Sequence, residues 1–141
     1  MDILDTLQIS ATGLSAERVR LQAIASNLAN ARTTRTEDGA GPYQRRMPVF
    51  EAQQLDPFGS ALDRELASVQ VTDVALDERP GRAVYDPGHP DADADGFVLY
   101  PAVDVMNEMV DLMTTSRSYE ANANVVDTTR ELAMRALEIG R

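Results

Sequence analysis

The stretch IASNLANART, residues 24–33, sets two asparagines into a sequence that otherwise has the apolar spacing of a helix. Asn27 and Asn30 share one face of that helix, and alanines keep the neighbouring face small. Small residues let helices approach closely, and an amide side chain can hydrogen bond across to another helix and fix its register. Asn30 is also expected to end the helix, because asparagine tolerates the left-handed backbone conformation. The alternative is that Asn27 is an ordinary surface residue and Asn30 an ordinary cap.

Leucines recur every seven residues from the N-terminus to this stretch. They are Leu7, Leu14, Leu21 and Leu28. The alternating positions of the same seam begin at Leu4 and are interrupted by Arg18. The pattern predicts a helix from about Leu4 to Leu28 with a packing face along its length. Gly13 lies inside this helix and is expected to weaken it by about 0.5–1 kcal/mol relative to alanine.

The C-terminal segment repeats the pattern. Steps of four and three residues from Val105 predict a helix of about 35 residues, with Asp104 capping its start. The segment YEANANVV (119–126) alternates alanine and asparagine, as the N-terminal stretch does. We therefore expect closely packed helices from both ends of the chain. The expected packing residues of this helix are Met109, Leu112, Tyr119, Asn122, Asn124, Val126 and Leu137.

Two arginines occupy seam positions of the predicted helices, Arg18 in the first and Arg130 in the second. A guanidinium in a seam either extends past the packed layer into water or pairs with an acid of a neighbouring helix. A polar contact between helices is the favoured interpretation, and simple exposure is the alternative.

The middle of the chain has a different periodicity. Strands are predicted at YQRRMPVF (43–50), SVQVTDVAL (68–76), RAVYD (82–86) and GFVLY (96–100). The apolar alternation of the second strand changes phase, which indicates a β-bulge near Thr72 and Asp73. Residues 51–67 are predicted to form a surface loop, with a short helix from Ser60 to Leu66.

These elements predict an α+β fold. Its N- and C-terminal helices pack as an antiparallel helical or coiled-coil layer, and a small β-rich region lies between them. We expect three parts: an N-terminal helix at 1–30, a β-rich middle domain with loops at 31–102 and a C-terminal helix at 103–141.

Composition excludes several classes of function. The net charge of −10 argues against nucleic-acid binding, which needs clustered basic residues. The absence of cysteine and the single histidine, His89, exclude thiolate chemistry and multi-histidine metal centres. Nothing singles out a catalytic pair of carboxylates, so no enzyme activity and no cofactor are expected. No apolar run is long enough to insert into a membrane, and MDILDTLQIS lacks the features of a cleavable signal peptide.

The acidic segment DADADG, residues 91–96, matches the opening of an EF-hand calcium loop. The twelfth loop position should be glutamate but is Ala102, and FVLY follows where a helix should begin. We therefore interpret 91–96 as a solvated turn, and His89 beside it as a turn histidine. A secreted calcium-binding module that uses this loop is the alternative from a different class.

Two long segments resemble the axial proteins of the bacterial flagellum, which form its rod and hook. They are LSAERVRLQAIASNLANARTTRTEDGAGPYQRR and VYDPGHPDADADGFVLYPAVDVMNEMVDLMTTSRSYEANANVV. The first segment is shared by several axial proteins, whereas YDPGHPDAD and SRSYEAN are specific to one proximal-rod member. Another axial rod subunit of the same family is therefore the alternative identity. The family usually has asparagine where this chain has Ala102, so a contact made by that asparagine is lost.

The resemblance implies a structural subunit of the proximal rod in the basal body. Such subunits polymerise through their terminal helices into a drive shaft that transmits motor torque across the periplasm. The implied partners are copies of itself, other rod subunits, and the MS-ring and export-gate adaptor proteins at the rod base. The resemblance also implies export through the flagellar type III apparatus without a cleaved signal peptide. It implies no catalytic, cofactor or metal site.

Overall fold

The structure is a computed structural model that describes residues 3–37, 39, 41–55 and 66–139. Its elements follow the order helix, four strands, helix. They are α1 (Ile3–Ala29), β1 (Arg46–Gln54), β2 (Ala67–Leu76), β3 (Arg82–Tyr85), β4 (Phe97–Tyr100) and α2 (Val105–Ile139). This order confirms the predicted α+β class, with the strands between the two helices.

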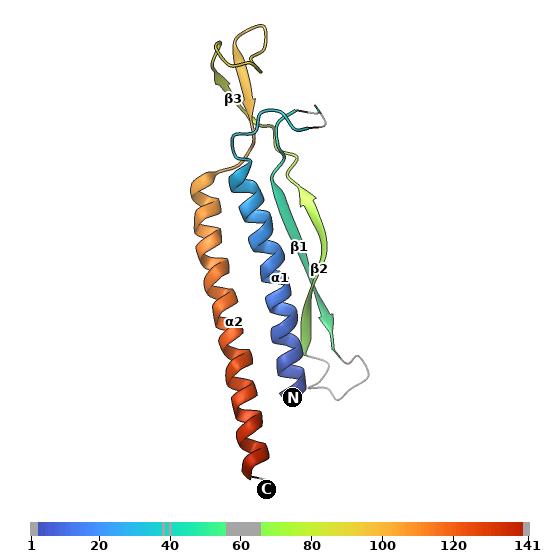
Figure 1. Cartoon of the computed structure of the whole chain (residues 1–141). Helices are drawn as coiled ribbons and strands as arrows, with labels where there is room; N and C mark the ends of the chain where they lie inside the picture. Colours follow the sequence, from blue (N-terminus) through green and yellow to red (C-terminus); the bar gives the residue numbers. More distant parts are fainter. Residues whose placement is uncertain (1–2, 38, 40, 56–65, 140–141) are drawn as a thin grey trace.

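The two helices lie side by side and run antiparallel, as predicted (Figure 1). α1 has 27 residues and α2 has 35, so their lengths are roughly 40 Å and 52 Å at 1.5 Å per residue. Both helices have the extent that the apolar periodicity predicts. α2 continues past the N-terminal end of α1 (Figure 1).

Asp104 caps the start of α2, as the sequence predicts. Its Oδ1 accepts hydrogen bonds from the backbone N–H groups of Met106 at 3.0 Å and Asn107 at 3.4 Å. Its Oδ2 accepts a further bond from the side-chain amide of Asn107 at 2.8 Å. These bonds satisfy donors that the first turn of a helix otherwise leaves without an acceptor.

Strands β1 and β2 form an antiparallel hairpin that lies along α1 (Figure 1). The pairing register shifts between Val49, which is opposite Asp73, and Phe50, which is opposite Val71. Thr72 is therefore the extra residue of a β-bulge, and the predicted bulge is confirmed.

The predicted loop at 51–67 is wrong at both of its ends. β1 continues to Gln54, β2 begins at Ala67, and the N–H of Leu55 donates to the carbonyl of Leu66 at 3.1 Å. The polar sequence EAQQ at 51–54 has low strand propensity, and pairing with β2 overrides that propensity. The predicted short helix lies outside the described residues, except for Leu66, which is not helical.

Strands β3 and β4 form a second, short antiparallel hairpin beyond the ends of the helices (Figure 1). The rings of Tyr85 and Phe97 meet edge to face across it, with centroids 5.4 Å apart. The two hairpins thus occupy different places, one along α1 and one beyond the helices. The proposed domain boundaries at residues 30 and 102 stay a prediction.

Gly81 is the point where the chain enters β3, and no side chain fits there. A Cβ at this position would lie 2.2 Å from the backbone carbonyl oxygen of Tyr100. We expect Gly81→Ala to displace the β3–β4 hairpin and to cost about 1–3 kcal/mol of unfolding free energy. Thermal unfolding followed by circular dichroism measures this change. Gly88→Ala is the control, because its Cβ would meet only Asp86 at an ordinary 3.6 Å, and equal melting temperatures for both variants would contradict the expectation.

The interior of the described chain is unusually polar. Its largest fully buried side chains are Glu108, Val98, Asn27 and Thr115. Large apolar side chains instead lie exposed on α2, on both hairpins and at the N-terminal end of α1. None of the helices within the described ranges is long and apolar enough to cross a membrane.

Candidate functional site

Asn27 lies at the centre of a buried cluster that joins α1, β1 and α2. Only 1% of the residue is exposed, and its amide makes four hydrogen bonds. The Nδ2 group donates to the carbonyl of Arg46 at 3.0 Å and to Oε2 of Glu108 at 3.1 Å. Oδ1 accepts from the hydroxyl of Tyr43 at 2.9 Å and from the backbone N–H of Arg46 at 2.8 Å. All the hydrogen-bonding capacity of the amide is therefore used within one chain.

Glu108 is the partner of Asn27 on α2, and it is equally buried. Its Oε1 accepts from Nε of Arg45 at 2.5 Å, so the buried carboxylate is paired with a cation. A guanidinium nitrogen of Arg45 also lies 3.9 Å from Asp111, one turn further along α2. A buried carboxylate needs such a partner, because removing an unpaired charge from water costs several kcal/mol.

Tyr43 connects the cluster to the end of α1. Its ring is buried, and its hydroxyl lies 3.0 Å from the hydroxyl of Ser26 as well as bonding Asn27. We define the polar junction as Asn27, Tyr43, Arg45, Arg46 and Glu108. The hydrogen bonds of the polar junction fix the relative positions of the end of α1, the start of β1 and the start of α2.

Asn30 follows the last residue of α1 and ends the helix, but not through the expected conformation. Among the described residues, only glycines have positive φ, so Asn30 is not left-handed. Its Nδ2 donates to the carbonyl of Ser26 at 2.9 Å, and its Oδ1 accepts from the hydroxyl of Thr33 at 3.1 Å. The side chain satisfies a terminal carbonyl directly, which removes the need for a left-handed residue.

Gly13 of α1 faces Asn122 of α2. A Cβ on Gly13 would lie 3.2 Å from the amide nitrogen of Asn122. The absence of a side chain on α1 therefore accommodates the half-buried Asn122 of α2. Asn124, the other asparagine of YEANANVV, is exposed.

The seam leucines of α1 are only half-buried in the single chain. Leu7, Leu14, Leu21 and Leu28 all have this intermediate exposure. The buried positions of α1 are instead mostly small or polar, namely Ser10, Ala16, Ala23 and Asn27, and Ile24 is the one large apolar residue among them. The second helix behaves similarly, because Leu112, Tyr119 and Val126 are half-buried whereas Met109 and Leu137 are exposed. Packing of these residues against other subunits stays a prediction.

Arg18 and Arg130 are both exposed on their helices. Within the part of the chain that the structure describes, neither side chain makes an ion pair or a hydrogen bond with another residue. The expected polar contact between helices therefore stays a prediction about neighbouring subunits.

Asp77 and Arg79 form a compact ion pair just after β2. The Arg79 guanidinium donates to both carboxylate oxygens of Asp77, at 2.5–3.0 Å, and the backbone N–H of Arg79 adds a bond at 3.0 Å. These hydrogen bonds lower the pKa of the Asp77 carboxyl from its usual value. The backbone N–H of Asp77 donates to the carbonyl of Arg45 at 2.8 Å, which links the pair to the polar junction.

The lowered pKa of Asp77 predicts a pH-dependent contribution to stability. The ionised carboxylate stabilises the fold above the pKa of the unfolded chain, about 4, and this contribution is lost as the pH falls through the lower folded-state pKa. We expect Asp77→Asn to lower the melting temperature at pH 7 and to have a smaller effect near pH 3. Thermal unfolding at both pH values tests this, with the exposed Asp127→Asn as control at pH 7. An unchanged difference between native and Asp77→Asn protein at the two pH values would contradict it.

The acidic segment 91–96 forms the turn between β3 and β4, as expected. Oδ1 of Asp93 accepts from the backbone N–H groups of Asp95 at 3.0 Å and Phe97 at 2.8 Å. Asp91 pairs with Arg35 at 2.6 Å and accepts from the hydroxyl of Thr34 at 2.8 Å. The carboxylates of Asp91 and Asp93 thus stabilise the turn and connect it to the segment after α1. No cluster of residues that could hold a metal ion occurs among the described residues. The calcium-binding alternative is not favoured.

His89 is half-buried in the same turn. Its Nδ1 accepts from the backbone N–H of Asp91 at 3.1 Å, and its ring lies edge to face with Tyr100 at 6.2 Å between centroids. The imidazole therefore has a local structural role in the turn.

Sequence reasoning identified Asn27 but missed Tyr43, Arg45 and Glu108. Glu108 is one residue before the predicted seam position Met109, so a one-position shift of the seam would have placed it inward. Its partner Arg45 lies 63 positions earlier in the chain, so helical periodicity gives no signal of the pairing.

Polar side chains fill much of the interior of the described chain, and many large apolar side chains lie exposed on its surface. Exposed apolar surface of this kind is typical of proteins that are covered by other subunits in an assembly. A family model described as "Flagella basal body rod protein" matches residues 7–35. A second, described as "Flagellar basal body rod FlgEFG protein C-terminal", matches residues 94–139.

Full-length relatives specify the family further. The chain is 39% identical to the flagellar basal-body rod protein FlgC of Bacillus subtilis, with all of both chains covered. It is 39% identical to FlgC of Salmonella typhimurium, again over all of both chains, and 40% identical to FlgC of Aquifex aeolicus over 98% of this chain and 97% of that one. The chain belongs to the family of flagellar basal-body rod protein FlgC.

Proposed function

We propose that the chain is a structural subunit of the proximal rod in the flagellar basal body. Membership of the FlgC family supports this function. The observation that carries it is the apolar stripe along the start of α2, which consists of Met106, Met109, Val110 and Met113. These side chains are each 47–71% exposed on α2. Contiguous exposed apolar surface of this kind marks a protein interface.

The proposed mechanism is mechanical and involves no chemical reaction. The polar junction holds α1, α2 and the β1–β2 hairpin in one register, so each subunit can act as a stiff unit. Neighbouring subunits would cover the apolar stripe and the seam leucines, and the resulting tube would resist twist. Motor torque would then pass along the rod towards the hook.

The partners of the proposed subunit are other copies and other rod subunits. At the rod base, they include the MS-ring and export-gate adaptor proteins. The subunit would reach the rod through the flagellar type III export apparatus, a route without a cleaved signal peptide. These partners and this route rest on the resemblance to axial proteins.

Met109→Glu tests the function without disturbing the fold. Because Met109 is exposed, we expect the free energy of unfolding to change by no more than about 0.5 kcal/mol. A charge in a covered interface should nevertheless exclude the variant from basal bodies and abolish swimming. Swimming assays and immunoblots of purified basal bodies, in cells where the variant replaces the native chain, measure both effects.

Met109→Leu is the matched control and should assemble normally. Absence of the native chain from purified basal bodies, or normal swimming in cells that lack the chain, would contradict the proposed function.

A further inference from the structure

The β3–β4 hairpin and its turn form a compact unit at one end of the molecule (Figure 1). We define residues 82–100 as the head. Its turn folds back onto the hairpin, because the ring of His89 lies edge to face with that of Tyr100, with centroids 6.2 Å apart. Val98 lies on the same face of the hairpin as Tyr100, two residues away, and is fully buried. The head therefore has a small core of its own.

Few bonds connect the head to the rest of the molecule. Among the described residues, β3 and β4 pair only with each other and do not join the β1–β2 sheet. The hydrogen bonds and ion pairs between the head and the remainder of the described chain converge on Asp91. Its Oδ1 accepts from the guanidinium of Arg35 at 2.6 Å, and its Oδ2 accepts from the hydroxyl of Thr34 at 2.8 Å. We define these three residues as the latch.

The partners of Asp91 belong to the segment after α1, which is itself held by the helical part of the molecule. Oδ1 of Asn30 accepts from the hydroxyl of Thr33 at 3.1 Å, and the carbonyl of Thr33 accepts from the backbone N–H of Tyr43 at 3.0 Å. Tyr43 in turn bonds Asn27 in the polar junction. A short series of contacts therefore connects the latch to the polar junction.

Two backbone segments, residues 77–81 and 101–104, join the head to the rest of the chain. We define them as the neck. An open concavity of about 720 Å³ lies between the neck and the first turn of α2, and both polar and apolar groups line it. A second concavity, of about 500 Å³, lies between the neck and the end of β2. Because both concavities are open, the head has space to pivot about the neck.

We propose that the latch sets the direction in which the head points, and that breaking the latch lets the head pivot about the neck. The exposed face of the head carries Tyr85, Phe97 and Leu99, so the latch determines where this apolar face is directed relative to α1. The Arg35 side chain is 68% exposed, so salt can screen its ion pair with Asp91 and the latch can open. The latch is complete within one chain, so its action does not depend on the proposed rod function.

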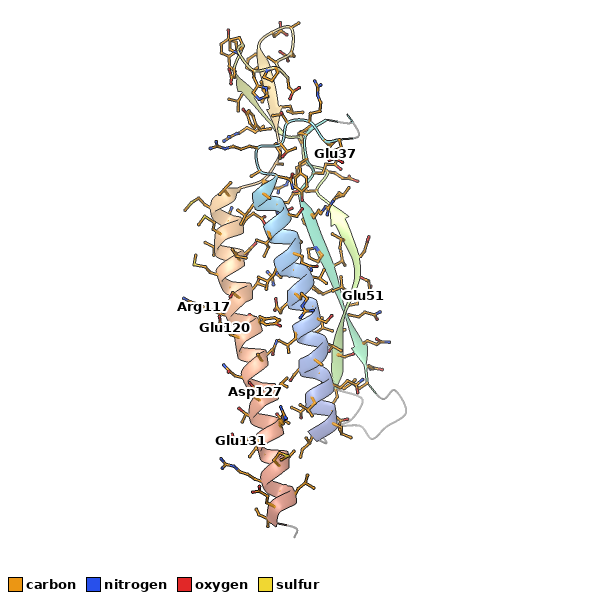
Figure 2. The ribbon with its side chains drawn as sticks, in the orientation of Figure 1. Glu37, Glu51, Arg117, Glu120, Asp127 and Glu131 are labelled. Carbon is orange, nitrogen blue, oxygen red and sulfur yellow. The ribbon has the colours of Figure 1, made fainter. Side chains whose placement is uncertain are left out.

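Spin labels on introduced cysteines measure the direction of the head in the purified chain, which has no cysteine of its own. The labelled positions are Ala83→Cys on β3 and Arg117→Cys on α2, both exposed. Pulsed electron–electron double resonance then gives the distribution of distances between the head and α2. A reference pair combines Arg117→Cys with Glu51→Cys on β1, two positions that lie outside the head (Figure 2).

We expect Asp91→Ala to broaden the 83–117 distance distribution by about twofold, because only the neck would then direct the head. The reference distribution should keep its width. Asp95→Ala is the matched control, because it removes an exposed carboxylate from the same turn whose side chain makes no bond within the described ranges. Equal widths for the two variants would overturn the inference, and so would a reference distribution that broadens as much as the 83–117 distribution.

The double variant Thr34→Val/Arg35→Ala breaks the latch from its other side and leaves the turn of the head intact. It should broaden the 83–117 distribution as much as Asp91→Ala does, and adding Asp91→Ala should broaden it no further. Arg32→Ala is its control, an exposed arginine of the same segment without an ion pair among the described residues. A double variant with the native width would show that other contacts direct the head.

Salt provides a readout that needs no change in the latch. At an ionic strength of about 1 M the screening length falls to about 3 Å, which weakens an exposed ion pair. The 83–117 distribution of the native latch should therefore broaden with salt, whereas that of Asp91→Ala should not change. Equal salt dependence of the two proteins would contradict the role of the ion pair in directing the head.

Discussion

Replacing Asn27 with leucine is expected to lower the free energy of unfolding by roughly 3–5 kcal/mol. Leucine fills a similar volume but offers neither donor nor acceptor. The backbone N–H and carbonyl of Arg46 would lose the bonds that Asn27 provides, and the buried Glu108 would lose one of its donors. Each buried polar group left without a partner costs about 1–3 kcal/mol. Since total stability is typically about 5–15 kcal/mol, this variant should be close to unfolding at growth temperature.

Denaturant unfolding of the purified chain measures this loss. The control is Asn124→Leu, an asparagine on α2 that is exposed and makes no side-chain hydrogen bond within the described ranges. It should change the free energy of unfolding by less than about 0.5 kcal/mol. Similar stabilities for the two variants would show that the polar junction does not hold the helices together.

Glu108→Leu is expected to have an effect of similar size, about 3–5 kcal/mol, because it breaks a buried ion pair. The guanidinium of Arg45 would keep only Asp111, at 3.9 Å, and the amide of Asn27 would lose an acceptor. Glu120→Leu is the matched control on the exposed surface of the same helix.

The double variant Arg45→Met/Glu108→Leu tests whether the lost stability comes from the unpaired charge of Arg45 or from the substitution at position 108. Replacing both charges with apolar groups should recover much of the lost stability, since a buried pair gains little over well-packed apolar residues. Equal stability of the double variant and of Glu108→Leu would indicate that Arg45 is not the essential partner.

The sequence was sufficient to predict the elements whose signal is local. The seven-residue spacing of leucines defines α1, Asp104 marks the start of α2, and the change of phase near Thr72 locates the bulge. Each of these depends on residues within one or two turns of the chain. The extension of β1 through EAQQ could not be predicted, because pairing with β2 determines it.

The candidate site was less predictable, because its contacts join residues that are far apart in the sequence. The asparagine at 27 signalled a polar contact across helices, but its partners come from positions 43, 46 and 108. Periodicity places residues on a face of one helix and carries no information about which face of another helix it meets. We likewise expect neighbours outside the single chain to cover the half-buried seam leucines, and periodicity does not show which neighbours these are.

Hydrogen exchange can be compared between the dilute monomer and purified basal bodies to test whether neighbouring subunits cover α2. We expect the second half of α2, with its exposed Leu132, Leu137 and Ile139, to exchange rapidly in the monomer and slowly in basal bodies. Residues around Asn27 and Glu108 should be protected in both states, because the polar junction is complete in one chain. Equal protection of the end of α2 in both states would contradict the claim that neighbouring subunits cover it.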